Sequence, residues 1–328
     1  MKMQTITRLI AGIAIVLGAA TPLCVHAQAA WPTQSLRLIV GYPAGSTPDV
    51  QARLIAEPLS KALGQPIIVD NKPGAGGTIG VDLVVKARDG HTIGVTGNGP
   101  LTTAKQLYAK LPYDPAIDVR PIGTIAEAPL VLVTRGALPV DSVAAFIAYA
   151  KHATPPISYG SAGNGSGAHL TMELLRTELK FEALHVAYPG FPQVTTALMG
   201  DQIDASTMVP SSALAQADSG KLKILAVTSL KRVPFLKTTP SIAEVTTLKS
   251  FNAVVWNGVF APKGFPDAAA NRLSSEVQKI VSSPEFQAKM TAQGWVAQAG
   301  SGADLAERMK KDGALWSDVI KSVNIQLD

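Results

Sequence analysis

The chain has 328 residues, of which 47% are hydrophobic and 5% aromatic, and it carries 29 basic against 24 acidic side chains. This composition excludes collagen-like, coiled-coil and disordered proteins, and so small a charge surplus does not favour nucleic acid as a partner. Abundant Ala, Val, Leu, Ile and Gly are typical of α/β domains with buried strands, and the length is enough for two such domains.

The first 29 residues have the pattern of a secretory signal peptide. Lys2 and Arg8 precede the apolar run 9–20, and small residues before Gln28 and Ala30 offer two cleavage sites. We expect residues 1–29 to be removed on export, which leaves 27 basic and 24 acidic residues. Cys24, the one cysteine of the sequence, lies in this segment, so we expect no disulfide. Leu23 stands before it, where a lipoprotein signal has a small residue, so we expect no lipid anchor.

In the amino-terminal half, short apolar runs alternate with loops rich in Gly and Pro and with helical periodicity. We expect strands at 36–40, 67–69, 91–96, 122–125 and 130–134, helices at 50–63 and from 81 to 85, and loops at 41–49, 71–80 and 97–100. Thr47 can cap the first helix, and Pro48 fits its first turn. Asp49 has two possible roles, either as an acid in the first helical turn or as a ligand contact.

The carboxyl-terminal half continues the alternation. We expect strands at 157–159, 184–186 and 223–228, one more strand and a helix after 200–204, and an apolar run at 254–261. We expect helices at 141–152, 167–179, 271–280 and 305–320, and one that follows the loop 187–192 and ends at 199. Strands alternating with helices from end to end predict an α/β fold with mostly parallel sheets. In such sheets ligands bind at the carboxyl ends of strands, where all the glycine-rich loops fall.

The segment 157–170 combines a strand, a loop of Gly, Ser and Asn, and the start of a helix. Glycines allow the backbone to approach a ligand closely, and the free N–H groups at a helix start favour a negative group. The loop therefore predicts a site for a small anion. An ordinary strand-to-helix turn with no ligand is the alternative.

Motifs for catalysis, cofactors and metals are missing from the sequence. There is no G-x-S-x-G elbow, and Ser166 with His169 has no orienting acid. We therefore expect His169 to be a satisfied polar residue at a helix start rather than a catalytic base. The run 163–168 matches G-x-G-x-x-[GA], but no acid follows the next strand, and no phosphate-loop motif occurs. The histidines are scattered, so we expect no metal and no cofactor.

The loops taken together resemble a known family. The segments are Tyr-Pro-Ala-Gly-Ser-Thr-Pro-Asp at 42–49, Asn-Lys-Pro-Gly-Ala-Gly-Gly at 71–77, Tyr-Gly-Ser-Ala-Gly at 159–163 with Ser166, His169 and Leu170, Val-Ala-Tyr-Pro-Gly at 186–190, Gly-Asp-Gln-Ile-Asp at 200–204, Trp-Asn-Gly at 256–258 and Ala-Pro-Lys-Gly at 261–264. This set resembles the Bug receptors, the periplasmic substrate-binding proteins of tripartite tricarboxylate transporters. The similarity extends over nearly the whole mature chain.

The resemblance implies an α/β, two-domain type II periplasmic-binding-protein fold with a hinge and a ligand cleft between the domains. The chain is expected to cross between domains near 134–136 and 228–233. Domain 1 then comprises residues 30–134 and 233–328, and domain 2 residues 135–232.

The resemblance also implies a receptor rather than an enzyme, working as a monomer in the periplasm of a Gram-negative bacterium. It is expected to capture a small organic carboxylate by hinge closure and to deliver it to membrane transporter subunits or to a sensor protein. A dicarboxylate or tricarboxylate, an acidic amino acid and an aromatic acid all stay open as ligands. The alternatives are a secreted enzyme acting on a small carboxylate in the same cleft and a nucleotide-binding domain.

In this family a ligand carboxylate is held by backbone N–H groups and waters of the first domain, whereas the second domain supplies side chains. The ligand-binding residues implied are Tyr42, Pro43, Ala44, Gly45, Ser46, Asp49, Gly76, Thr96, Asn98, Ser161, Gly163, Gly165, Ser166, His169, Tyr188, Gly190 and Asp204. Tyr42 and Ser46 stand where the family has Phe and a second Gly, and Pro189 stands where Lys is common. These departures bear on which carboxylate is bound.

Overall fold

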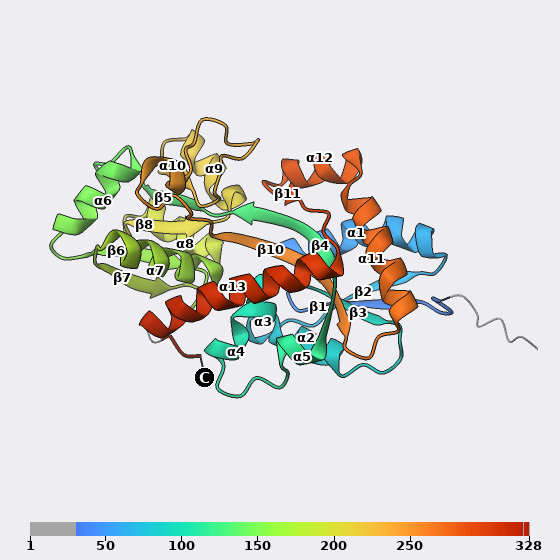
Figure 1. Cartoon of the computed structure of the whole chain (residues 1–328). Helices are drawn as coiled ribbons and strands as arrows, with labels where there is room; N and C mark the ends of the chain where they lie inside the picture. Colours follow the sequence, from blue (N-terminus) through green and yellow to red (C-terminus); the bar gives the residue numbers. More distant parts are fainter. Residues whose placement is uncertain (1–30, 324, 328) are drawn as a thin grey trace, which may run out of the picture.

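The computed structural model describes residues 31–323 and 325–327, so the predicted signal peptide and its cleavage sites lie outside the described residues. Two lobes, each built on one β-sheet, lie side by side, and helix α13 (Gly302–Val323) runs across both (Figure 1). Among the described helices, none is both long and apolar enough to cross a membrane. The α/β fold predicted from the sequence is confirmed, but the expectation of mostly parallel sheets is wrong. Of the nine pairings between described strands, four are parallel and five are antiparallel, and the antiparallel ones all involve the strands next to the chain crossings.

The first lobe contains a six-stranded sheet in the order β11-β4-β10-β3-β1-β2. Its strands are β1 (Leu36–Val40), β2 (Ile67–Asn71), β3 (Thr92–Gly97), β4 (Val119–Pro129), β10 (Val254–Pro262) and β11 (Val296–Ala297). One apolar core joins the sheet to α1 (Thr47–Leu63), α11 (Asp267–Val281) and α12 (Pro284–Ala292). A second core joins it to α2 (Thr78–Val85), α3 (Asn98–Thr102) and the first half of α13.

The second lobe contains a five-stranded sheet in the order β7-β6-β8-β5-β9. Its strands are β5 (Val131–Arg135), β6 (Ile157–Ser161), β7 (Ala183–Ala187), β8 (Ala205–Met208) and β9 (Leu222–Val227). Helices α6 (Val143–His152), α7 (Gly167–Leu179) and α10 (Ile242–Val245) share one apolar core with it, and α8 (Phe191–Met199) and α9 (Pro210–Asp218) share another.

The chain changes sheets at two closely packed places. Strands β4 and β5 are separated only by Leu130, and the chain returns from β9 through residues 228–253 to β10. The buried Thr228 joins both crossings, because its Oγ1 accepts the N–H of Leu130 at 2.8 Å and its carbonyl accepts the N–H of Ala253 at 2.9 Å. The domain boundaries at 134 and 232 stay predictions.

Most predicted helices and strands fall within observed ones, but the segment after β3 does not. Residues 97–100 were expected as a loop, whereas α3 starts at Asn98 and is followed by the short helices α4 (Ala104–Leu107) and α5 (Pro115–Asp118). Pro100 is accommodated because the first helical turn needs no N–H partner. The Oγ1 of Thr102 donates to the Asn98 carbonyl at 2.7 Å within this short helix.

Asp204 lies just before β8 and forms hydrogen bonds to both neighbouring strands, β6 and β5, at that edge of the second sheet. Its carboxylate accepts the N–H of Ser158 at 2.9 Å, the Ser158 hydroxyl at 3.1 Å and Nε of Arg135 at 3.0 Å. Burial would raise the pKa of Asp204, but these hydrogen bonds outweigh it and lower the pKa below the ordinary 3.8. The charged carboxylate is therefore part of the folded edge.

Replacing Asp204 by Ala should lower the free energy of unfolding by about 2 kcal/mol at neutral pH, because charge-assisted hydrogen bonds to Ser158 and Arg135 are lost. A folded-state pKa below 3.8 means that the stabilisation is complete above pH 3.8 and declines as the pH falls further. Denaturant unfolding at several pH values measures this. Asp201→Asn is the matched control, since the exposed 3.4 Å ion pair with Arg135 should contribute at most a few tenths of a kcal/mol, and Asn tolerates the left-handed backbone conformation at φ +54° as Asp does. Equal effects of the two substitutions would contradict this role of Asp204.

Candidate functional site

The carboxyl ends of strands from both sheets meet where the chain crosses between the lobes. In the first sheet, Gly97 at the end of β3 pairs with Asn257 near the start of β10. In the second sheet, β8 ends at Met208, opposite Val131 just after the crossing, and β6 and β7 run parallel to β8. The helices that follow β1, β3, β6 and β7 therefore begin at this junction with free N–H groups and positive dipole ends.

In the first lobe, Asp49 fixes the loop that opens α1. Its carboxylate is 2% exposed and accepts the N–H of Gly45 at 2.8 Å, Nδ2 of Asn71 at 2.9 Å and the guanidinium of Arg53. Burial would raise the pKa of Asp49, but these bonds outweigh it and keep the pKa below its ordinary value. Of the two roles left open for Asp49, the contacts favour that of a structural acid in the first helical turn.

Ser46 precedes α1 in the N-cap position but does not cap the helix with its side chain. Its Oγ is buried and has no hydrogen-bond partner among the described residues. Pro43 and Ala44, just before it, are exposed at the loop surface. An unpaired hydroxyl beside the start of a 17-residue helix is a donor available to an anion.

Tyr42 lies across the ends of neighbouring loops of the first lobe. Its hydroxyl donates to the Gly76 carbonyl at 3.1 Å, and burial raises the pKa of Tyr42 to about 12, so the phenol stays protonated. The buried Oγ1 of Thr96, at the end of β3, has no partner, and Asn98 begins α3. These residues lie at the carboxyl ends of β1 and β3, and their contact with a ligand stays a prediction.

In the second lobe, the residues predicted for the loop after β6 hold its backbone. Ser161 is fully buried, and its Oγ donates to the Gly163 carbonyl at 3.0 Å. Gly165 donates its N–H to Nδ1 of His169 at 3.0 Å, and Ser166 caps α7 by accepting the N–H of His169. His169 is 5% exposed, so it lies beneath the loop rather than on its surface.

The neighbouring loop after β7 lies against this one. Tyr188 donates its N–H to the Ser161 carbonyl at 3.0 Å, and a Cβ on Gly163 would lie 3.7 Å from the Tyr188 carbonyl. Gly190 is the N-cap residue of α8 and leaves that helix start without a side-chain cap. Tyr188 is half-buried.

The loops of the two lobes also approach each other. A Cβ on Gly165 would lie 2.7 Å from Cδ1 of Leu107 and 3.1 Å from Cδ1 of Leu327, and one on Gly167 would lie 3.0 Å from Cγ1 of Val255. The space that Gly165 leaves free is thus occupied by leucine side chains. Asp204 is not brought to this junction, because it lies at the opposite, amino end of β8 with its carboxylate already bonded.

Sequence reasoning did not single out a polar pair behind the end of β3. Nδ2 of Asn257 donates to Oε1 of Gln51 at 2.8 Å, both residues are buried, and Nε2 of Gln51 has no partner. A Cβ on Gly97 would lie 3.2 Å from Oδ1 of Asn257. The feature of the sequence that could have indicated this pair is Asn257, the one amide side chain in the apolar run 254–261.

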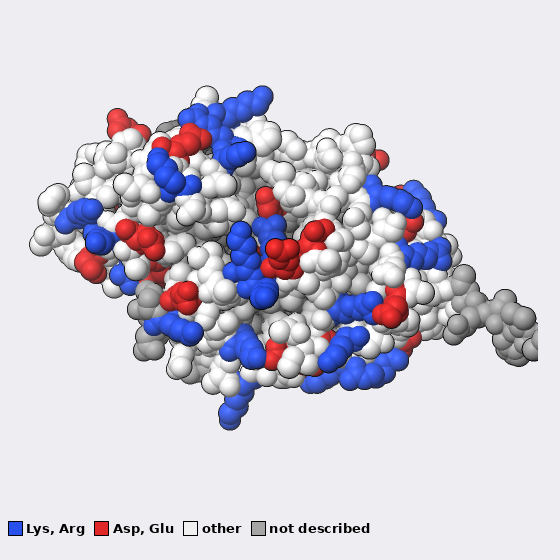
Figure 2. Space-filling view, in the orientation of Figure 1, with Lys and Arg blue, Asp and Glu red and all other residues white. Residues whose placement is uncertain are grey.

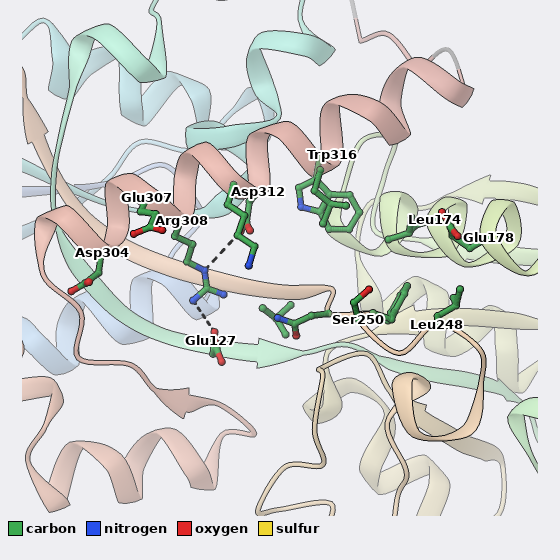
Figure 3. A pocket seen from close by; sticks show the side chains of 15 residues that line it. Glu127, Leu174, Glu178, Leu248, Ser250, Asp304, Glu307, Arg308, Asp312 and Trp316 are labelled. Atoms are coloured by element: carbon green, nitrogen blue, oxygen red, sulfur yellow. Dashed lines mark ion pairs between the residues drawn. The ribbon is translucent and has the colours of Figure 1, made fainter.

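A separate cavity of about 700 Å³ lies between α13, α7 and residues 248–252 (Figure 3). Arg308 in this cavity pairs with Glu127 at 2.7 Å and with Asp312 at 3.8 Å. Figure 2 shows basic side chains beside acidic ones over the same part of α13. Acidic residues outnumber basic ones in its lining, and none of the predicted ligand-binding residues belongs to it, so it does not suit an anionic ligand. Within residues 31–323 and 325–327 no cluster of His, Cys, Asp and Glu could hold a metal.

Comparisons with known proteins bear on the family and the fold. A UPF0065 protein from the tcbD–tcbE intergenic region of Pseudomonas sp. strain P51 is 33% identical over 320 residues, which cover 95% of this chain and 93% of that protein. The structure of the periplasmic binding protein BugD is 31% identical with a TM-score of 0.75, and that of R. palustris Rpa4515 with adipate is 32% identical with a TM-score of 0.79. Each structural match covers 90% of this chain and 100% of the other.

These matches confirm the two-lobe periplasmic-binding fold that the sequence predicted. The family model described as the tripartite tricarboxylate transporter family receptor matches residues 51–325, which is most of the chain. The chain therefore belongs to the tripartite tricarboxylate transporter receptor family, the Bug-type solute-binding proteins that its loops resemble.

Proposed function

We propose that this protein is a periplasmic receptor that binds a small organic dicarboxylate between its lobes and delivers it to membrane transporter subunits or a sensor. The observation that carries the proposal is the meeting of helix starts from both lobes at one junction, with the unpaired Ser46 hydroxyl beside α1. Helix starts on both sides suit a ligand with a negative group at each end.

The charges near the loops favour backbone recognition of the ligand. In the first lobe Arg53 is engaged by Asp49 and Asn71, so it is not a free cation for a ligand. Backbone N–H groups, the Ser46 hydroxyl and ordered water would then hold the carboxylate, as in other anion sites at helix starts. The adipate present in the structure of Rpa4515 supports the ligand class.

An enzyme acting in the same cleft is the weaker proposal. Oγ of Ser161 lies 2.7 Å from Nε2 of His185, the contact expected of a nucleophile and its base. However, Ser161 is fully buried and already donates to the Gly163 carbonyl. The nearby Glu173 is bonded to Tyr159 and Arg176 and does not orient His185.

A thermal-shift assay of the mature protein tests the ligand class. Adipate or malate at 100 times its dissociation constant should stabilise the folded state by about 2.7 kcal/mol and raise the melting temperature by about 5 °C. Adipamide, which has the same carbon chain without charges, is the control and should give no shift. Stabilisation by ATP and by no carboxylate would contradict the proposal.

Ser46→Ala should weaken dicarboxylate binding about tenfold, which corresponds to about 1.4 kcal/mol, because one hydrogen-bond donor to the anion is lost. Stability of the ligand-free protein should not change, since this hydroxyl bonds nothing there. Calorimetric titration gives the affinity and denaturant unfolding the stability.

The matched control is Ser142→Ala, which removes a hydroxyl that caps α6 by accepting the N–H of Ala145. It should cost about 1 kcal/mol of stability and leave the affinity unchanged. The site at α1 would be refuted if Ser46→Ala bound the ligand as tightly as the unsubstituted protein does.

A further inference from the structure

Two histidines are stacked beneath the loop that opens α7. The rings of His169 and His185 lie 3.7 Å apart between centroids and are tilted by only 10°. The ring of Tyr159 lies beside this pair, with its centroid 4.9 Å from that of His185 and 6.3 Å from that of His169. These rings lie beneath residues 163–166, the loop at the start of α7 that faces the ligand in the proposed function.

The hydrogen bond to the loop determines the protonation state of His169. Gly165 donates its N–H to Nδ1, so Nδ1 must keep its lone pair and the ring must be neutral with its proton on Nε2. A proton on Nδ1 would place two donors face to face and a positive charge against His185. The folded loop, in which Gly163 and Gly165 have φ of +108° and +70°, is therefore incompatible with a charged His169.

The first lobe contains the same arrangement with a different acceptor. Gly45 donates its N–H to Asp49 four residues later, as Gly165 does to His169, and each acceptor is the third residue of its helix. The acceptor in the first lobe keeps its charge because its pKa is lowered. Only the second loop thus depends on an acceptor that loses its lone pair in mild acid.

We propose that His169 is a positioning residue that holds the loop 163–166 in its ligand-binding conformation, and that its protonation releases the loop and weakens binding. The proposal rests on the proposed function only in assuming that this loop contacts the ligand. His169 itself makes no ligand contact in this account, because it is buried beneath the loop.

The groups around His169 come from three elements. His185 faces it from β7, Tyr159 from β6, and Glu173 and Arg176 from its own helix α7. Glu173 would favour a charged His169, but its carboxylate already binds the Tyr159 hydroxyl at 2.5 Å and Arg176 Nε at 2.8 Å. On the loop's other side, Gly165 faces Leu107 and Leu327, which carry no charge.

The direction of the pH effect follows from burial. Burial, and secondarily the neighbouring His185, lowers the pKa of His169 from the ordinary 6.5 to about 4 while the loop is in place. A released loop would restore the ordinary value. The equilibrium constant that favours the held loop over the released loop is therefore at its full value above pH 6.5. It falls by at most tenfold per pH unit down to about pH 4.

The test is nuclear magnetic resonance of the ligand-free mature protein between pH 7.5 and 4, with calorimetric titration of adipate over the same range. We expect imidazole ¹⁵N shifts to show His169 protonated on Nε2 at pH 7.5. The Gly165 amide resonance should move as the pH falls below 6.5, while amides of the sheets stay in place, and adipate affinity should fall with it.

Two variants distinguish positioning from a merely structural role. In His169→Asn, Oδ1 takes the place of Nδ1 and accepts the Gly165 N–H without titrating, so the amide resonance should become independent of pH. The affinity should keep only the decline caused by protonation of adipate itself, whose carboxyl groups resemble Glu with an ordinary pKa of about 4.3. His152→Asn, which removes an exposed histidine at the end of α6, should keep the pH dependence.

A Gly165 resonance that stays constant between pH 7.5 and 4, or a pH dependence of that resonance that survives in His169→Asn, would overturn the proposal. So would a proton on Nδ1 at pH 7.5. Failure of adipate to bind at pH 7.5 would count against the proposed ligand class instead, and the resonance of Gly165 in the ligand-free protein decides the role of His169 without any ligand.

Discussion

The close packing of the two chain crossings is the constraint on which the rest of this structure depends. Thr228 joins Leu130 and Ala253, so the first sheet's central strands and the second sheet's antiparallel strand β5 meet at one point. Because β1 and β3 on one side and β6 and β7 on the other run towards that point, their helices begin there. Backbone dipoles from both lobes converge without any free cation in the loops, which is the physical basis for recognising a small anion.

The loops at this junction are fixed by hydrogen bonds to side chains of the helices that follow them. Each lobe uses a glycine N–H bound by the third residue of the following helix, Asp49 in the first lobe and His169 in the second. A held loop loses less conformational freedom when a ligand binds, so more of the contact energy contributes to affinity. The two acceptors differ in how they titrate, and this difference makes the second lobe the one that responds to mild acid.

The sequence could predict that the glycine-rich loops follow strands, whereas the roles of individual residues within them could not be predicted. Glycine-rich loops after apolar runs such as 157–159 mark strand ends reliably, because backbone geometry there is local. Asp204 follows a similar loop, but only the register of β8 shows that it lies at the opposite edge. The pair of Gln51 and Asn257 joins residues 206 positions apart, which no local pattern indicates. His169 was expected either as a satisfied polar residue or as a ligand contact, and its neighbours favour the first.

The most direct test of the account is a crystal structure of the mature protein with the carboxylate that stabilises it most. The account predicts one carboxylate within hydrogen-bond distance of the Ser46 hydroxyl and the first N–H groups of α1, and the other facing the helix starts of the second lobe. A carboxylate held by lysine or arginine side chains elsewhere, for example in the cavity beside Arg308, would contradict it.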